Sequence, residues 1–301
     1  MTAPIPGPVF AIPTPFENSS GDISLPAQRD FLHFLHERKA RSIVVNGSTG
    51  EFSSLTAAER NKAFQAARAC FTGYVINNIS STSYREANAF ARASAGADAL
   101  LILPPYYFTQ VTEEGLIDFF RHALNGVDIP VYLYNFPRNV NIAITAALCA
   151  RLRDACPVIV GVKDSSGDLP GAVAIAQGAG DALSVFLGKD TLAFAALRAG
   201  LAGSITGAGD PFPEFLVEIA AAAQAGDRAR AENAQTAFDV WNAFRARLAV
   251  DEAALVKAAI ALRLSGFPVS VRPPLAPLKA AAEAELIKMV ARLLAGDLFE
   301  A

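Results

Sequence analysis

A single lysine ends an apolar run near the middle of this chain. Residues 158–162 read Val-Ile-Val-Gly-Val, and Lys163 follows them directly. A run of this length and β-branched content is typical of a strand buried on both faces, which places Lys163 at the exit of that strand. Partial desolvation there would disfavour the ammonium form and leave a neutral amine that can form a Schiff base with a carbonyl. The alternative is a lysine that extends its amine into solvent.

Tyrosines follow two other apolar runs. Tyr134 ends the run that starts at Val131, and it precedes Lys163 by 29 residues, the spacing of one strand–helix unit. We therefore expect the two residues on neighbouring strands, whose spacing is about 4.8 Å. A phenol at that position can pass protons during Schiff-base chemistry, whereas the alternative is a half-buried tyrosine that bonds a loop carbonyl. Tyr106 and Tyr107 are expected at the same end of the sheet, where they could instead be interface aromatics.

Two hydroxyl residues, Ser48 and Thr49, lie between Gly47 and Gly50. Such glycines allow successive backbone N–H groups to point into one concavity and bind a carboxylate, although the same stretch could be a plain turn. A lysine, a phenol and a carboxylate-binding loop on one rim form a joint pattern that the separate alternatives do not explain.

Eight short apolar runs alternate with amphipathic helical patterns, and the runs start 20 to 33 residues apart. This alternation predicts a closed parallel (β/α)8 TIM barrel of the α/β class, whose active site lies at the C-terminal ends of the strands. A doubly wound sheet is the alternative, but residues 12–16 after the first run lack its Gly-rich fingerprint. The predicted strands are Val9–Ile12, Ser42–Val45, Val75–Asn78, Ala99–Leu103, Val131–Tyr134, Val158–Val162, Leu183–Leu187 and Gly203–Thr206.

The pattern changes near Pro213 to long Ala-rich helical stretches without a strand signal. We predict a catalytic barrel over residues 1–212 and a C-terminal helical region over residues 213–301, in which a Pro-rich connection spans residues 266–277.

Three threonines are placed to begin helices. Thr56 and Glu59 form a capping box, which predicts a loop before Thr56 and a helix after it. Thr145 and Thr191 are expected to cap two later helices.

Composition narrows the function classes. The chain is 52% apolar and 18% charged, its formal net charge is −3, and no basic block is present, so neither nucleic acid nor an anionic membrane is an expected partner. We expect a cytoplasmic protein, because there is no signal-peptide pattern and no apolar run of about 18 residues. Metal-ligand spacing is lacking, so no metal site is expected and the cysteines are predicted to be reduced. The residues concerned are Cys70, Cys149, Cys156, His33, His36 and His122.

Several motifs together resemble those of the pyruvate-dependent class I lyases, the family of dihydrodipicolinate synthase, N-acetylneuraminate lyase and the 2-keto-3-deoxy sugar-acid aldolases. They run in the family's order over nearly the whole chain. The matching stretches are Thr14-Pro-Phe16, Gly47-Ser-Thr-Gly-Glu51, Pro105-Tyr-Tyr107, Tyr134-Asn-Phe-Pro137, Gly161-Val-Lys-Asp-Ser-Ser-Gly167 and Arg272-Pro-Pro.

The resemblance implies roles for individual residues. Lys163 would form the Schiff base with pyruvate, and Tyr134 would shuttle protons to and from the adduct. Ser48 and Thr49, in the loop that begins at Gly47, would hold the pyruvate carboxylate. Ser48 would also relay protons to Tyr107 of a neighbouring subunit. Pocket-lining backbone is expected at Gly188 and Ile205. The family implies a homotetramer built from tight dimers and no metal or organic cofactor.

The loop after Tyr134 departs from the synthase pattern. Synthases typically carry an arginine two residues after the proline of this motif, whereas here Arg138 follows Pro137 directly and Asn139 comes next. Arg138 and Asn139 are the candidates to contact the second substrate, and Asn141 replaces a glycine found in several relatives. The synthases also usually have threonine in place of Ser48.

The motif stretches around Tyr134 and Lys163 look most like those of the sugar-acid aldolases. We therefore expect an aldolase that joins or separates pyruvate and a small aldehyde, with a 2-keto-3-deoxy acid as the joined substrate. The alternatives are a synthase that uses aspartate semialdehyde, a 2-keto-3-deoxy acid dehydratase, and a keto-acid sensor that forms no covalent adduct.

Overall fold

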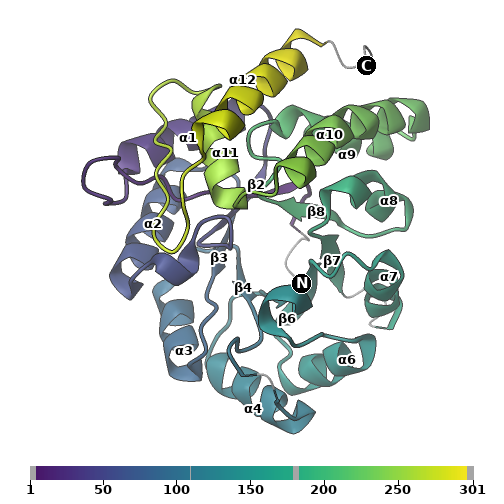
Figure 1. The fold of residues 1–301 in the computed structure, drawn as a ribbon. Helices are drawn as coiled ribbons and strands as arrows, with labels where there is room; N and C mark the ends of the chain where they lie inside the picture. Colours follow the sequence, from purple (N-terminus) through teal and green to yellow (C-terminus); the bar gives the residue numbers. More distant parts are fainter. Residues whose placement is uncertain (1–4, 109, 179–182, 297–301) are drawn as a thin grey trace.

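Eight parallel strands close into a barrel in chain order, with β8 pairing back to β1 (Figure 1). The computed structural model describes residues 5–108, 110–178 and 183–296. The predicted (β/α)8 barrel is confirmed. Its strands are β1 Val9–Ala11, β2 Ser42–Val45, β3 Tyr74–Asn78, β4 Ala99–Ile102, β5 Val131–Asn135, β6 Ile159–Asp164, β7 Ser184–Leu187 and β8 Gly203–Thr206.

Helices surround the strands, as the alternating pattern predicted. One of these helices lies between each pair of successive strands. They are α1 Leu25–Glu37, α2 Ala57–Cys70, α3 Tyr84–Ala93, α4 Glu113–Ala123, α6 Ala146–Ala155, α7 Leu169–Gly178 and α8 Ala193–Arg198. The short α5 Pro137–Val140 and the 3-10 turns η1 Phe52–Ser54 and η3 Asp190–Leu192 were not predicted.

A glycine inside β6 makes room for an aromatic ring. Tyr132 of β5 pairs with Gly161, and a Cβ atom built on Gly161 would lie 2.2 Å from Cε1 of Tyr132. Real Cβ atoms do not approach so closely, because cores are already packed to near crystal density. The glycine in the Val-Ile-Val-Gly-Val run therefore lets the Tyr132 ring lie across β6.

Two of the three predicted helix caps are confirmed. Thr56 and Glu59 form the capping box of α2, and the Thr145 hydroxyl accepts a hydrogen bond from Leu148 N–H at the start of α6. The prediction for Thr191 is wrong. Thr191 lies inside η3, so its backbone is already turned and cannot adopt the extended conformation that an N-cap needs. The residue before α8 is Leu192, which has no capping side chain.

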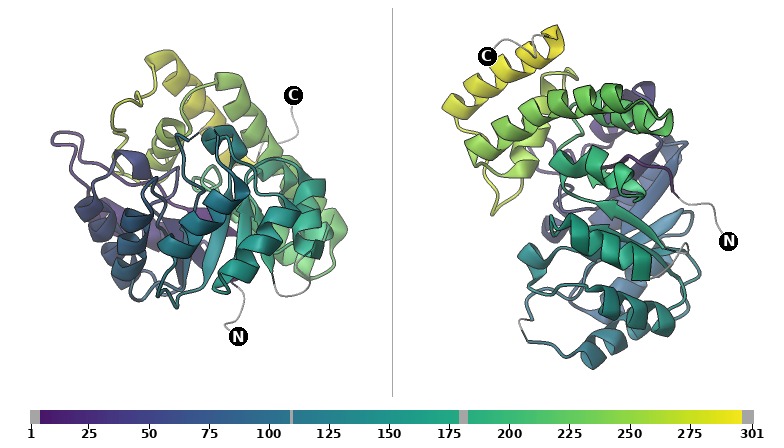
Figure 2. Two further views of the ribbon diagram at one scale, coloured as in Figure 1. Left: turned by 90° about the horizontal axis from the view of Figure 1, so that it is seen from below. Right: turned by 90° about the vertical axis from the view of Figure 1, so that its right-hand side faces the viewer.

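In the described part of the chain, the helices that follow β8 gather on one side of the barrel, with α12 farther from the strands than α11 (Figures 1 and 2). They are α9 Pro213–Gln224, α10 Arg228–Leu248, α11 Glu252–Ala261 and α12 Ala280–Ala295. Outward-facing Phe10 and Ile43 of the barrel share one apolar cluster with Trp241 of α10 and Val256 of α11. The indole N–H of Trp241 also donates to the carbonyl of Ala208, just after β8. The C-terminal helices are thus joined to the barrel by a continuous core.

The division of the chain at residue 212 stays a prediction, since α9 follows β8 in the same way that α8 follows β7. None of the described helices is both long and apolar enough to span a lipid bilayer.

Candidate active site

The lysine and the phenol lie opposite one another on paired strands. Lys163 of β6 is in register with Tyr134 of β5, as predicted. The Lys163 Nζ atom lies 4.2 Å from the centroid of the Tyr134 ring, and Lys163 is only 5% exposed. The alternative of a solvated lysine therefore does not hold. β6 runs on to Asp164, so Lys163 lies inside the strand and not beyond its end as expected.

Lysines are almost never buried without a charged partner. Within the described part of the chain, Lys163 forms no ion pair, and its neighbour is the face of the Tyr134 ring. A buried amine that the fold leaves unpaired is a typical sign of a reactive group.

Polar side chains directly after the lysine and the tyrosine hold the two strand ends together. The Asn135 amide donates to Asp164 over 2.6 Å, and Asn135 accepts from Ile144 N–H over 2.9 Å. The other Asp164 oxygen accepts from Ser166 N–H over 2.9 Å. These positioning contacts were not predicted, although the sequence signal was available: Asn and Asp are depleted in strands.

The loop after β2 meets β5 across the mouth of the barrel. Ser48 Oγ lies 3.4 Å from the hydroxyl of Tyr134, although β2 and β5 are not adjacent strands. The contact shows that side chains from separate strand ends converge on one place. Tyr134 therefore has the amine on one side and the Ser48 hydroxyl at its tip.

The same loop has the features of an anion-binding turn. The backbone at Asn46 and Glu51 is left-handed, with φ values of 59° and 56°. Among the described residues, no acceptor takes the N–H group of Ser48 or of Thr49. The Thr14 hydroxyl donates to the carbonyl of Gly50 over 2.7 Å and fixes the far side of the loop. Two consecutive free N–H groups in such a turn are available to a carboxylate.

Two glycines allow close approaches between loops, of the loop after β8 to the loop after β2 and of the loop after β7 to the loop after β6. A Cβ atom on Gly207 would lie 1.9 Å from the Thr49 hydroxyl oxygen, and one on Gly188 would lie 2.0 Å from the Ser165 hydroxyl oxygen. Gly188 directly follows β7, and buried Ile205 lies in β8. The C-terminal ends of the strands therefore carry Gly47, Ser48 and Thr49 after β2, Tyr134 in β5, Lys163 in β6, Gly188 after β7 and Ile205 in β8.

Tyr107 is not part of this group within one chain. It is 87% exposed and has a φ of 82°, which is unusual for a bulky residue. Its ring lies 6.0 Å from that of Phe108, which is also exposed. The expected contact of Tyr107 with another subunit stays a prediction. Tyr106, in contrast, packs edge-on against Phe52 and is partly buried, which raises the pKa of its phenol.

The loop after Tyr134 forms the short helix α5, on which Arg138 and Asn139 are both exposed. Asn141 ends α5 in the left-handed conformation, with a φ of 56°. Asparagine tolerates this conformation better than other residues that carry a Cβ atom. The replacement of a glycine by Asn141 therefore has a backbone explanation.

Two buried carboxyl groups near the strand ends escaped prediction. Asp210 is 0% exposed, and neither of its carboxyl oxygens has a hydrogen-bond partner among the described residues. Burial raises the pKa of Asp210 well above its ordinary value, and the charge of Lys163 opposes this shift. Burial also raises the pKa of Asp190, whose carboxylate pairs with Arg245 over 3.0 Å. In the described ranges, no cluster of three or more His, Cys, Asp or Glu side chains could hold a metal ion.

These features define a barrel enzyme with an unpaired buried amine, a phenol and an anion-binding loop at one mouth. The chain belongs to the dihydrodipicolinate synthetase family, whose model matches residues 5–293. Lyases of this family are pyruvate-dependent class I enzymes.

Curated relatives and solved structures were both found for this chain. The 4-hydroxy-tetrahydrodipicolinate synthase of Methanopyrus kandleri is 32% identical over 283 residues, which are 93% of this chain and 92% of the relative. The synthase of Corynebacterium aurimucosum is 34% identical, with 92% and 89% covered. Among solved structures, YagE of E. coli K12 in complex with pyruvate has a TM-score of 0.89 at 27% identity, with 95% and 97% covered. KD(P)GA from T. tenax has a TM-score of 0.86 at 28% identity, with 96% and 98% covered.

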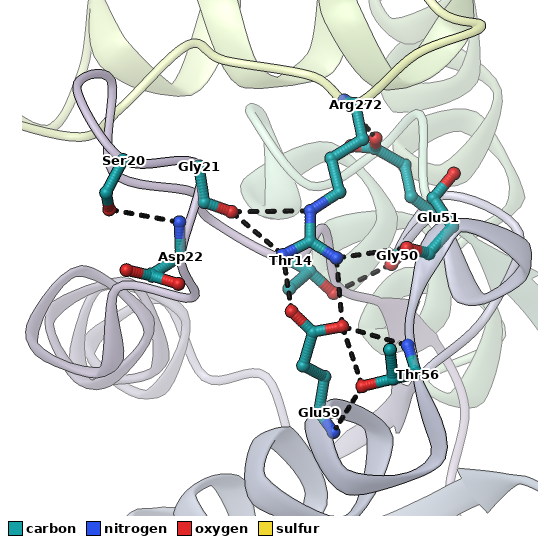
Figure 3. A network of polar contacts seen from close by, with 10 residues as sticks. Thr14, Ser20, Gly21, Asp22, Gly50, Glu51, Thr56, Glu59 and Arg272 are labelled. Atoms are coloured by element: carbon teal, nitrogen blue, oxygen red, sulfur yellow. Dashed lines mark hydrogen bonds and ion pairs between the residues drawn. The ribbon is translucent and has the colours of Figure 1, made fainter.

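An arginine from the Pro-rich connection secures the start of α2 near the candidate site (Figure 3). The Arg272 guanidinium donates to Glu59 over 3.0 Å, to the carbonyl of Ser54 over 3.0 Å and to that of Gly21 over 2.8 Å. The hydrogen bond from Arg272 is the main reason that the pKa of Glu59 falls to about 2. The ordinary pKa of such a carboxyl group is 4.5.

This shift predicts a pH-dependent effect of Glu59→Gln. A depressed carboxyl pKa stabilises the folded state fully above the ordinary pKa, and the stabilisation is lost as the pH falls through the folded-state value. We expect the loss of unfolding free energy in Glu59→Gln to be largest above about pH 5 and to shrink toward pH 2. Urea unfolding of both proteins over this range is the measurement, and a difference that is the same at all pH values would contradict the ion pair. Gln preserves the capping box, so the helix cap is not lost in the comparison.

Proposed function

We propose that the protein is a Schiff-base-forming class I aldolase that makes or breaks a carbon–carbon bond between pyruvate and an aldehyde, with 2-keto-3-deoxy sugar acids as the substrate class. The observation that carries the proposal is the buried, unpaired amine of Lys163 against the ring of Tyr134. The described complex of YagE with pyruvate supports the keto acid. The likeness to KD(P)GA supports the sugar-acid class.

In this mechanism the Lys163 amine attacks the keto carbon of pyruvate, and loss of water leaves an iminium ion. The iminium withdraws electrons from the adjacent carbon, so that a proton can leave and the resulting enamine can attack an aldehyde. Bond cleavage is the same sequence in reverse. The Tyr134 hydroxyl, 3.4 Å from Ser48, carries protons to and from the adduct. The N–H groups of Ser48 and Thr49 bind the carboxylate, while the backbone of Gly188 and Ile205 lines the pocket.

The second candidate is a synthase that condenses pyruvate with aspartate semialdehyde, which the names of the curated relatives favour. Its second substrate carries a carboxylate that an arginine would bind. Arg138 and Asn139 are the residues we assign to the second substrate. Arg138 is exposed on α5, one position nearer to Pro137 than the arginine of typical synthases. Turnover of a panel of 2-keto-3-deoxy acids, compared with that of aspartate semialdehyde, separates the two. Preferential condensation of aspartate semialdehyde would overturn the sugar-acid assignment.

Two single substitutions test the roles of the paired strand residues. Lys163→Ala should abolish turnover and leave the barrel folded, because none of the ion pairs among the described residues involves the amine. Tyr134→Phe should lower kcat by roughly 10²- to 10⁴-fold, because the proton shuttle is lost while the ring that covers Lys163 remains. Steady-state kinetics with far-UV circular dichroism as the folding control is the measurement. Retention of more than a few per cent of activity in Lys163→Ala, or a change below about threefold in Tyr134→Phe, contradicts the assignment.

The exposed Tyr107 leads us to propose that it completes the site of a neighbouring subunit in a homotetramer. Three described cysteines are free, which supports a cytoplasmic location.

Subunit mixing tests the sharing of Tyr107. Tyr107→Ala and Lys163→Ala should each be nearly inactive alone. Mixed tetramers should regain activity, because a site that has Lys163 from one chain can receive Tyr107 from the other. The absence of regain in mixtures shown by native mass spectrometry to contain both chains would place Tyr107 outside the shared site.

A further inference from the structure

Glu51, the last residue of the Gly-Ser-Thr-Gly-Glu motif, is held by the C-terminal part of the chain. The side chains of Glu51 and Lys257 are both 0% exposed, and Lys257 Nζ lies 2.5 Å from one Glu51 oxygen. The other oxygen accepts the backbone N–H of Arg272 over 2.9 Å. Lys257 also donates to the carbonyl of Ser270 over 2.8 Å and lies 4.2 Å from the centroid of the Phe16 ring. Both oxygens of Glu51 thus have partners that lie more than 200 residues away in the sequence.

The backbone of Glu51 closes the turn that presents Ser48 and Thr49. Its N–H group donates to the carbonyl of Ser48 over 3.0 Å. Its φ of 56° is in the left-handed region, which glutamate rarely adopts. Since the residue has no local preference for this conformation, other contacts must hold it there. The buried carboxylate supplies them.

We infer that Glu51 is a positioning residue: its carboxylate, clamped by Lys257 of α11 and by the backbone of Arg272, holds the turn whose Ser48 and Thr49 N–H groups receive the carboxylate of the keto acid. The inference rests on the proposed function. It gives two motifs that the proposed chemistry leaves unused, Glu51 and the Arg272-Pro-Pro stretch, a common purpose. It also makes α11 and the connection after it part of the architecture of the active site. Figure 3 shows Arg272 of that connection next to Glu51.

If the Glu51–Lys257 ion pair had a purely structural role, its loss would affect stability and not the binding of pyruvate. When both members of a buried pair are replaced by uncharged side chains of similar shape, stability is often unchanged or improved, whereas removal of one member leaves an unpaired buried charge. The double variant Glu51→Gln/Lys257→Met removes both charges and keeps most of the volume. If the pair serves only stability, this variant binds pyruvate as the wild type does.

The experiment titrates pyruvate against the fraction of protein that borohydride traps irreversibly at Lys163, read by mass spectrometry. We expect the half-saturating pyruvate concentration to rise about 10- to 100-fold in the double variant, because misplacement of a binding group by about 1 Å can cost that much. Labelling should still reach completion at saturating pyruvate, with Tm within a few degrees of the wild type. The single variant Glu51→Gln is titrated as well, so that a double variant that fails to fold does not leave the role undecided.

Arg263→Met is the matched control. Arg263 lies just after α11 and is nearly buried, and it joins the end of α11 to Glu214 of α9 over 2.8 Å. Its partners, Glu214 and the carbonyl of Pro211, lie outside the Gly47–Glu51 loop. The Arg263→Met substitution should lower the Tm without changing the half-saturating pyruvate concentration.

A titration of the Glu51 variants within about threefold of the wild type, or an equal shift in Arg263→Met, overturns the positioning role. Failure of pyruvate to label the wild type at Lys163 overturns the proposed function itself, which separates the two conclusions.

Discussion

Parallel pairing of β5 with β6 is the constraint on which the site depends. The register sets Tyr134 opposite Lys163 and Asn135 opposite Asp164, and the Asn135–Asp164 hydrogen bond of 2.6 Å fixes the ends of both strands. A slip of one residue would turn Lys163 toward the other face of the sheet, because side chains alternate along a strand. Closure of the barrel then brings the loop after β2 across the mouth, where Ser48 meets the hydroxyl of Tyr134.

The buried ionisable side chains near the strand ends differ in whether they have an ion-pair partner. Lys257 has Glu51 and Asp190 has Arg245, so these charges are compensated where they are removed from water. Lys163, in contrast, is 5% exposed and has the face of the Tyr134 ring in place of an ion-paired carboxylate. Burying an ammonium group without a partner is unfavourable, and a fold retains such an arrangement when the group acts on something that arrives from outside. The contrast within one molecule singles out Lys163 as the reactive amine.

The barrel could be predicted because the period of the helical patterns, the length of the apolar runs and their spacing are local properties of the sequence. Apolar runs of four or five residues that alternate with helical patterns are compatible with few architectures. The positions of Tyr134 and Lys163 followed from that topology alone. Other features depend on contacts between distant residues. Thr191 looked like a cap, but the chain turns through η3 first, and the anchoring of Glu51 by Lys257 joins positions 206 residues apart. Asp210 is fully buried just after β8, which no local pattern near Gly209 indicates. Tyr107 is expected to act in another subunit, so a single chain leaves it exposed.

The most direct test of the account is to incubate the intact protein with pyruvate, reduce it with borohydride, and map the modified residue by peptide mass spectrometry. The account predicts one reduced pyruvate adduct per chain, located at Lys163, and no adduct in Lys163→Ala. Folded wild-type protein without any adduct, or with the adduct at another lysine, would contradict the assignment of Lys163 as the Schiff-base residue.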